Sequence, residues 1–147
     1  MIRVDIYVKE YNWNIHAFFA VSEYYVDEIM DMLWNIDCNS DTALKAFENM
    51  TSGRLNTGFC YSNYAQKESV MVVAKTTSAA QFANSLHHEL VHLQSHIGKA
   101  FYLEPTSEDV AYLSGEIMMT IYPKIKHLLC DCCRYEKKKN KMHNEVQ

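Results

Sequence analysis

The chain has 147 residues, of which 48% are hydrophobic and 22% charged, and its net charge is −4. This length suits a single domain, and this composition excludes an intrinsically disordered chain. Residues 134–147 carry a net charge of +3, which leaves −7 for the rest of the chain. Such an acidic body argues against a duplex nucleic acid partner, because duplex binding requires a basic face. We therefore expect one domain over residues 1–133 and a basic, flexible tail over residues 134–147.

No targeting segment is evident in the sequence. The first residues, "MIRVDIYVKEYNW", alternate like a strand and contain no continuous apolar core of a secretory signal. No run approaches the roughly 18 apolar residues that a membrane span requires. The five cysteines are an odd number, so a disulfide framework is not expected. These features predict a cytoplasmic protein with reduced thiols.

Periodicity and local signals predict strands and helices in a grouped order. In chain order we expect two strands (2–10 and 13–21), two helices (22–36 and 40–50), two strands (57–63 and 68–76) and two helices (78–97 and 107–122). Grouped strands and helices indicate an α+β fold with a short antiparallel or mixed sheet, rather than alternating βαβ units.

Capping residues support the helix boundaries. Ser22 is the expected N-cap of the first helix, and Ser40 or Asp41 that of the second. A capping box is expected at the start of the third helix, formed by Ser78 and Gln81, and a C′ glycine, Gly98, at its end. Pro123 is expected to follow the last helix.

The third helix contains the segment "SLHHELVHLQSHIG" (85–98), with four of the seven histidines. At about 100° per residue, His88, His92 and His96 form a stripe next to the apolar face of this helix. His87 points away from the stripe and is not expected to bind the same ion.

His88, Glu89 and His92 form an HExxH motif. Residues four apart stand one turn apart on one helix face, so their imidazoles can converge on one tetrahedral zinc ion. The adjacent glutamate can accept a proton from a water molecule that the metal activates. His96 lies eight residues from His88, or roughly 12 Å along the axis, and is too far away to share an ion with it.

A catalytic zinc usually has a third protein ligand, which the sequence places less clearly. The candidates are Glu104, Glu108, Asp109 and Glu116. We favour Glu108, because it is centred on the apolar side of the last helix, where an unpaired carboxylate is costly. The alternative is that Glu108 only stabilises a helix N-terminus. Tyr112, one turn later, is either an oxyanion donor or a tyrosine in a helix interface.

The segments "LHHELVHL" and "EDVAYLSGE" resemble the zincin metallopeptidases, specifically small gluzincin-like proteins of bacterial or phage type. The resemblance covers roughly residues 66–122. It implies a zincin-like domain with one zinc ion per chain, bound by His88, His92 and Glu108, and Glu89 as the general base. It also implies that an upstream strand pairs with an extended peptide or protein substrate, and "ESVMVVAKT" (68–76) has that position in the chain order.

Three of the five cysteines, Cys130, Cys132 and Cys133, lie close together in "CDCC" (130–133), with His127 and His143 nearby in the sequence. Their spacing departs from the usual zinc-binding pattern, so they are either exposed thiols or a structural metal site. Cys38 and Cys60 are expected to be small core residues. The function expected from the sequence is zinc-dependent hydrolysis of peptide bonds, and the alternative is a non-catalytic zinc-containing interaction protein.

Overall fold

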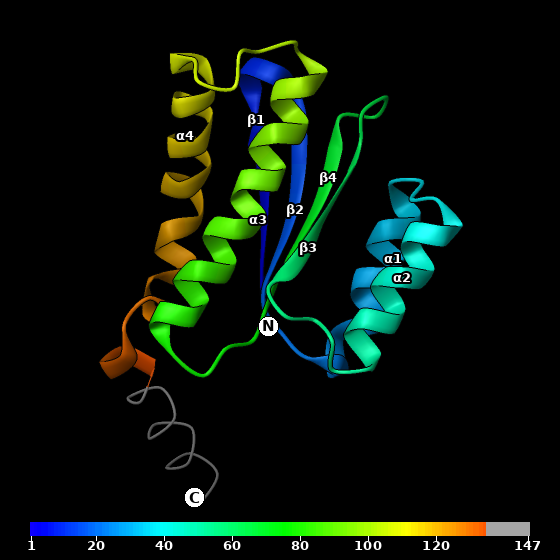
Figure 1. Ribbon diagram of the computed structural model, residues 1–147, viewed down its shortest axis with the longest axis vertical. Helices are drawn as coiled ribbons and strands as arrows, with labels where there is room; N and C mark the ends of the chain where they lie inside the picture. The colour runs from blue at the N-terminus through cyan, green and yellow to red at the C-terminus, as the bar shows by residue number, and fades with distance from the viewer. Residues whose placement is uncertain (135–147) are drawn as a thin grey trace, which may run out of the picture.

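The computed structural model describes residues 1–134. It confirms the predicted α+β class: one four-stranded mixed sheet lies between two layers of helices (Figure 1). The strands are β1 (Ile2–Val8), β2 (Trp13–Val21), β3 (Gly58–Asn63) and β4 (Glu68–Ala74). The α-helices of the described part are α1 (Val26–Asn35), α2 (Ser40–Thr51), α3 (Ala79–Ala100) and α4 (Glu108–Ile125).

The strand order in the sheet is β1-β2-β4-β3. β2 pairs antiparallel with β1 and parallel with β4, and β4 pairs antiparallel with β3. The expectation that residues 68–76 form the strand beside the substrate is therefore wrong. β4 is hydrogen-bonded on both sides, whereas β3 is an edge strand with one unpaired side.

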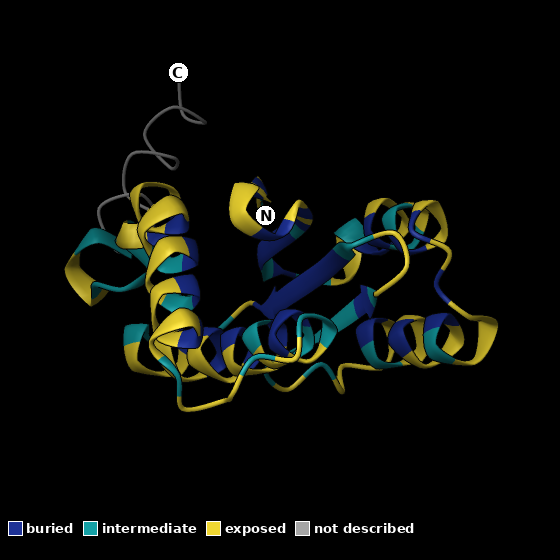
Figure 2. Ribbon diagram, turned by 90° about the horizontal axis from the view of Figure 1, so that it is seen from above, coloured by how far each residue is buried: buried dark blue, intermediate teal, exposed yellow. Residues whose placement is uncertain are grey.

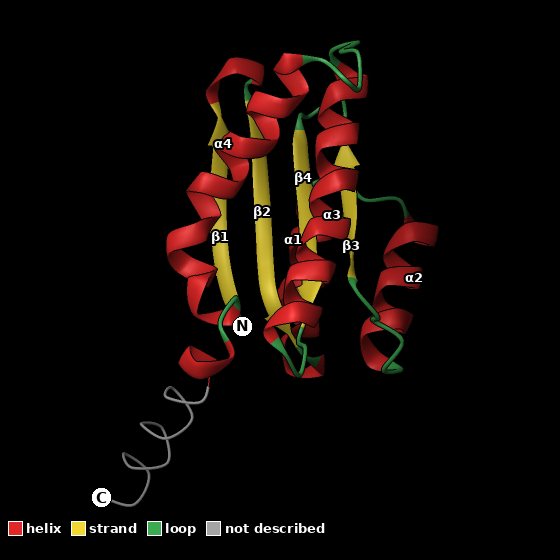
Figure 3. Ribbon diagram, turned by 60° about the vertical axis from the view of Figure 1, so that its left-hand side comes forward, coloured by secondary structure: helices red, strands yellow, loops and turns green. Residues whose placement is uncertain are grey.

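Two hydrophobic clusters form on the two faces of the sheet. One contains Ile15, Phe19 and Met71 packed against α3 and α4, and the other contains Phe18 and Val72 packed against α1 and α2. Figure 2 shows buried strands between helices whose outer faces are exposed, and in Figure 3 α3 crosses β4 and β3 while α4 covers β1. This layering follows from the alternation of side chains along each strand, which sends neighbouring residues to opposite faces.

Gly58, at the start of β3, is required by the local backbone. Its φ of +145° is rarely adopted by other residues, and a Cβ there would lie 1.8 Å from the carbonyl oxygen of Val72. Glycine thus allows β3 to begin pairing with β4 directly after Thr57. The side chain of Thr57 donates a hydrogen bond to Glu89 of α3.

Several predicted helix boundaries were wrong. Ser22 precedes a short 3-10 helix (Glu23–Tyr25) rather than capping α1. Asn39 caps α2 in place of Ser40 or Asp41, because its side chain accepts the Thr42 amide hydrogen.

The ends of α3 and α4 also differ from expectation. Ser78 accepts the Gln81 amide hydrogen as predicted, but the Gln81 side chain accepts from Thr77 rather than completing a capping box. α3 continues through Gly98 to Ala100, and a Cβ at Gly98 would lie 3.8 Å from the Cγ2 atom of Val110 in α4, an ordinary van der Waals distance. α4 continues through Pro123, whose missing amide hydrogen does not end the helix here.

Most of the predicted tail, residues 135–147 with His143, lies outside the described residues. Arg134 is hydrogen-bonded to the domain, through Leu128 and Thr76. Among the described residues, none of the helices has the length and apolar character needed to cross a lipid bilayer.

Candidate metal and catalytic site

Helix α3 positions the HExxH residues on its flank facing β3. Its apolar residues, including Leu86, Leu90 and Leu93, are buried against the sheet. His88 and His92 are exposed, one turn apart on the side next to that apolar face. The helical period predicted from the sequence therefore gives the expected distribution of buried and exposed residues.

The two imidazoles converge. The Nε2 atoms of His88 and His92 are 3.2 Å apart, and the ring centroids are 4.9 Å apart. His87 is exposed and lies outside this pair. Two nitrogen atoms at this separation on an exposed surface can exchange a hydrogen bond, or both can bind one metal ion.

Glu89 follows His88 in α3 but is only 2% exposed. Thr57 Oγ1 donates a hydrogen bond to its Oε1 atom at 2.8 Å. None of the ion pairs found among residues 1–134 includes Glu89. A buried carboxyl group without a cationic partner is costly to folding, so its presence here requires a reason other than stability.

His96 faces the sheet rather than the His88–His92 pair. Its Nδ1 atom is 2.8 Å from Ser62 Oγ, which lies 2.7 Å from Ser69 Oγ, and the Trp13 indole N–H donates to Ser69. Burial first, and then His92 and Lys99, lower the pKa of His96. The neutral imidazole is therefore fixed to β3 through Ser62.

The structure does not bring Glu108 to the histidines. Among the described residues, no aspartate, glutamate or cysteine forms a three-ligand group with His88 and His92. The reason is geometric: α4 approaches α3 at Gly98, which is about 15 Å along the axis from His88 and on a different side of the helix.

The other predicted ligands behave in the same way. Three further candidates are exposed: Glu104, Asp109 and Glu116. Within residues 1–134, no group of potential metal ligands includes them. Tyr112 is 73% exposed, so it is not packed in a helix interface.

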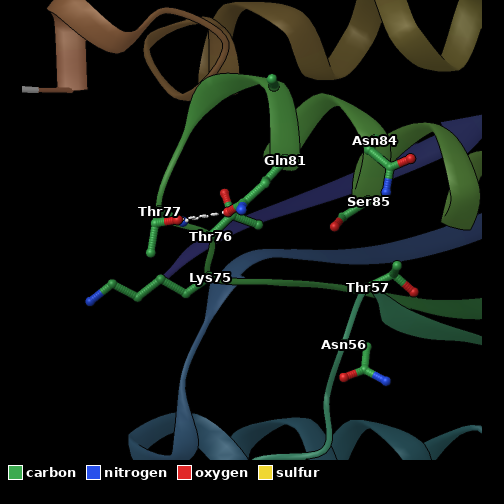
Figure 4. Close-up of a pocket in the computed structure, with 9 residues that line it drawn as sticks. Asn56, Thr57, Lys75, Thr76, Thr77, Gln81, Asn84 and Ser85 are labelled. Atoms are coloured by element: carbon green, nitrogen blue, oxygen red, sulfur yellow. Dashed lines mark hydrogen bonds between the residues drawn. The ribbon is translucent and has the colours of Figure 1, made fainter.

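A polar pocket of about 570 Å³ lies one turn before Glu89 along α3 (Figure 4). Most of its lining side chains carry hydroxyl or amide groups, and the lining is Asn56, Thr57, Lys75, Thr76, Thr77, Ala80, Gln81, Asn84 and Ser85. Thr57 connects the two features, because it lines the pocket and also donates to Glu89. Lys75 is the charged residue of the lining.

Thr57, Ser62 and this pocket have no local signal in the sequence. Each depends on residues that are distant in sequence, since Thr57 and Glu89 are separated by 32 positions and Ser62 and His96 by 34. A single threonine or serine in a strand carries no local signal of such a contact.

A second group of potential metal ligands lies at the end of the described chain. The Sγ atoms of Cys130, Cys132 and Cys133 are all within 4.8 Å of one another, a geometry that could hold a metal ion. Cys38 is buried as expected, and Cys60 is partly buried against the core.

Comparisons of the chain with protein-family models, with curated protein sequences and with solved structures give no match. Its function must therefore be argued from the geometry of these groups.

Proposed function

We propose that this protein is a zinc-dependent hydrolase of peptide bonds, in which His88 and His92 bind the metal and Glu89 is the general base. The observation that carries the proposal is the convergence of two exposed imidazoles from a helix turn that also carries a buried carboxyl group, Glu89. The HExxH spacing alone would permit this arrangement, but the side chains could have adopted rotamers that point apart.

The separation of the two imidazoles fits zinc. With zinc–nitrogen bonds of about 2.05 Å and a tetrahedral angle, two ligand nitrogens are about 3.3 Å apart. The Nε2 atoms of His88 and His92 are 3.2 Å apart. They therefore have a separation suitable for ligation without a change of rotamer. When zinc is bound, it supplies a Lewis acid for the attacking water and the scissile carbonyl.

Glu89 has the chemistry of a proton acceptor. The Thr57 hydroxyl fixes one of its carboxyl oxygens, which limits its rotamers and directs the group. A zinc ion bound by His88 and His92 would offset the cost of burying an unpaired carboxylate. Glu89 accepts the proton of the attacking water and then delivers it to the leaving amine.

β3 and the polar pocket supply surfaces for a substrate. The outer side of β3 has unpaired backbone groups that can pair with an extended peptide. The pocket, next to Glu89 through Thr57, suits a polar side chain of that peptide, and Lys75 favours an acidic one. We therefore propose peptides with an acidic or polar residue beside the cleaved bond as substrates.

A non-catalytic zinc protein is less well supported. Structural zinc sites are closed by four protein ligands, whereas the described residues offer His88 and His92 alone at this position. A site with open coordination positions and an adjacent carboxyl group suits catalysis better.

The test uses two measurements on the same protein, zinc content and cleavage of a peptide library. Glu89→Gln should keep the zinc and lose cleavage, whereas His88→Ala should lose both. Stoichiometric zinc with no cleavage of any peptide by the unmodified protein would contradict the catalytic role.

A further inference from the structure

Three cysteines at the end of the described chain form a compact group of sulfur atoms that the proposed hydrolase does not use. Cys130, Cys132 and Cys133 have their Sγ atoms within 4.8 Å of one another, and those of Cys130 and Cys132 are 2.7 Å apart. Cys132 is exposed and the other two are half-buried, so an ion can reach the group from solvent.

This segment is anchored to the start of α3, beside which it lies in Figure 1. Asp131, between two of the cysteines, accepts a hydrogen bond from the Ala79 amide at 2.8 Å. The Arg134 guanidinium donates to the carbonyl oxygens of Leu128 and Thr76. These contacts on both sides of Cys132 hold the three sulfur atoms near one another before any ligand arrives, which lowers the entropy lost on binding.

The distances between the sulfur atoms suit one ion bound by three thiolates. With metal–sulfur bonds of about 2.3 Å, the zinc–thiolate value, a planar three-ligand site has sulfur atoms about 4.0 Å apart. A limit of 4.8 Å is compatible with this site, although Cys130 and Cys132 must move apart.

Metal binding by these residues releases protons. Thiolates rather than thiols are the metal ligands, so each cysteine loses its proton to the solvent as its metal–sulfur bond forms.

The number and type of ligands distinguish among metals. Thiolates select soft ions such as Cu(I), zinc and iron–sulfur clusters. Structural zinc takes four protein ligands, whereas this group offers three within the described residues, with no histidine or carboxylate.

We propose that Cys130, Cys132 and Cys133 bind one soft monovalent cation of the Cu(I) class through three thiolates. Three thiol protons leave as three metal–sulfur bonds form, so the bound group carries a charge of −2. Arg134, the next residue along the chain, and the positive end of α3 offset part of this charge.

The test is competition for Cu(I) between the full chain and a chromogenic Cu(I) chelator, without oxygen and with a phosphine reductant. The chain should remove one equivalent of Cu(I) from the chelator. Cys132→Ser should weaken the apparent affinity at least tenfold, and the matched control Cys38→Ala, which removes a distant buried thiol, should leave it unchanged.

Two further measurements make the test independent of the proposed hydrolase. A His88→Ala/His92→Ala variant should bind Cu(I) as the unmodified chain does, because the histidines are not part of this group. The proposal is overturned if the chelator keeps its copper. It is also overturned if replacing all three cysteines by serine leaves binding intact, or if Zn(II) at equal concentration displaces the Cu(I).

Discussion

Replacing Glu89 with glutamine separates the catalytic role of this residue from its structural role. Glutamine has nearly the same shape as glutamate, and its amide oxygen can still accept the hydrogen bond that Thr57 donates at 2.8 Å. The amide cannot accept the proton of the attacking water. A positioned general base contributes about 10²- to 10⁴-fold to rate, so peptide cleavage should fall by that factor.

The same substitution has opposing effects on stability. A hydrogen bond to a charged group contributes about 1.5–3 kcal/mol and a neutral one about 0.5–1.5 kcal/mol, so the Thr57 contact should lose about 1 kcal/mol. Glu89 is 2% exposed and has no ion-pair partner within residues 1–134, so the neutral amide avoids the cost of burying a charge. The free energy of unfolding should therefore be unchanged or higher.

Denaturant unfolding and cleavage of a fluorogenic peptide library measure the two effects. Glu89→Ala is the matched control, because it removes the base and the Thr57 hydrogen bond together and should lower both activity and stability. Activity of the Glu89→Gln protein within tenfold of the unmodified protein would refute the role of Glu89 as base. A large loss of stability would refute the account of its burial.

Other substitutions test the surroundings of the site. Glu108→Ala should leave zinc content unchanged, because α4 approaches α3 far from the histidines; loss of zinc by metal analysis would contradict this placement. Thr57→Val should lower kcat of peptide cleavage about tenfold by freeing the Glu89 carboxyl group, while zinc content stays the same. Leu93→Ala should lower the free energy of unfolding by about 2–5 kcal/mol, because Leu93 of α3 is fully buried in the hydrophobic core. Burial raises the pKa of the Cys38 and Cys60 thiols, so a thiol reagent should modify only Cys130, Cys132 and Cys133 in the native protein, and all five in denaturant.

The periodicity of the sequence predicts the main helices and strands, and it also predicts the relative directions of the HExxH residues in the candidate site. Four strands and four helices were predicted close to their observed ranges, because alternation and helical spacing are local properties. His88, Glu89 and His92 belong to one helix, so their relative directions follow from that helix alone. Boundaries were less predictable, since Asn39 competes with Ser40 as a cap and Pro123 is accommodated in α4.

The rest of the site depends on how distant segments pack. The placement of Glu108 depends on where α4 packs along α3, and Val110 of α4 lies near Gly98 of α3. The central position of β4 in the sheet has a signal in the sequence. The segment "VMVVA" (70–74) is continuously apolar, as is typical of a strand buried on both faces. β3 has no such run and is the edge strand.

The most direct test of the central proposal is metal analysis of a chain whose three clustered cysteines, Cys130, Cys132 and Cys133, are replaced by serine. This background removes the thiol group as an alternative zinc site. We predict one zinc ion per chain in this background, and no bound zinc after His88→Ala or His92→Ala is added. Absence of zinc from the background protein after incubation with zinc and removal of the excess would contradict the proposal, as would zinc retained without the two histidines.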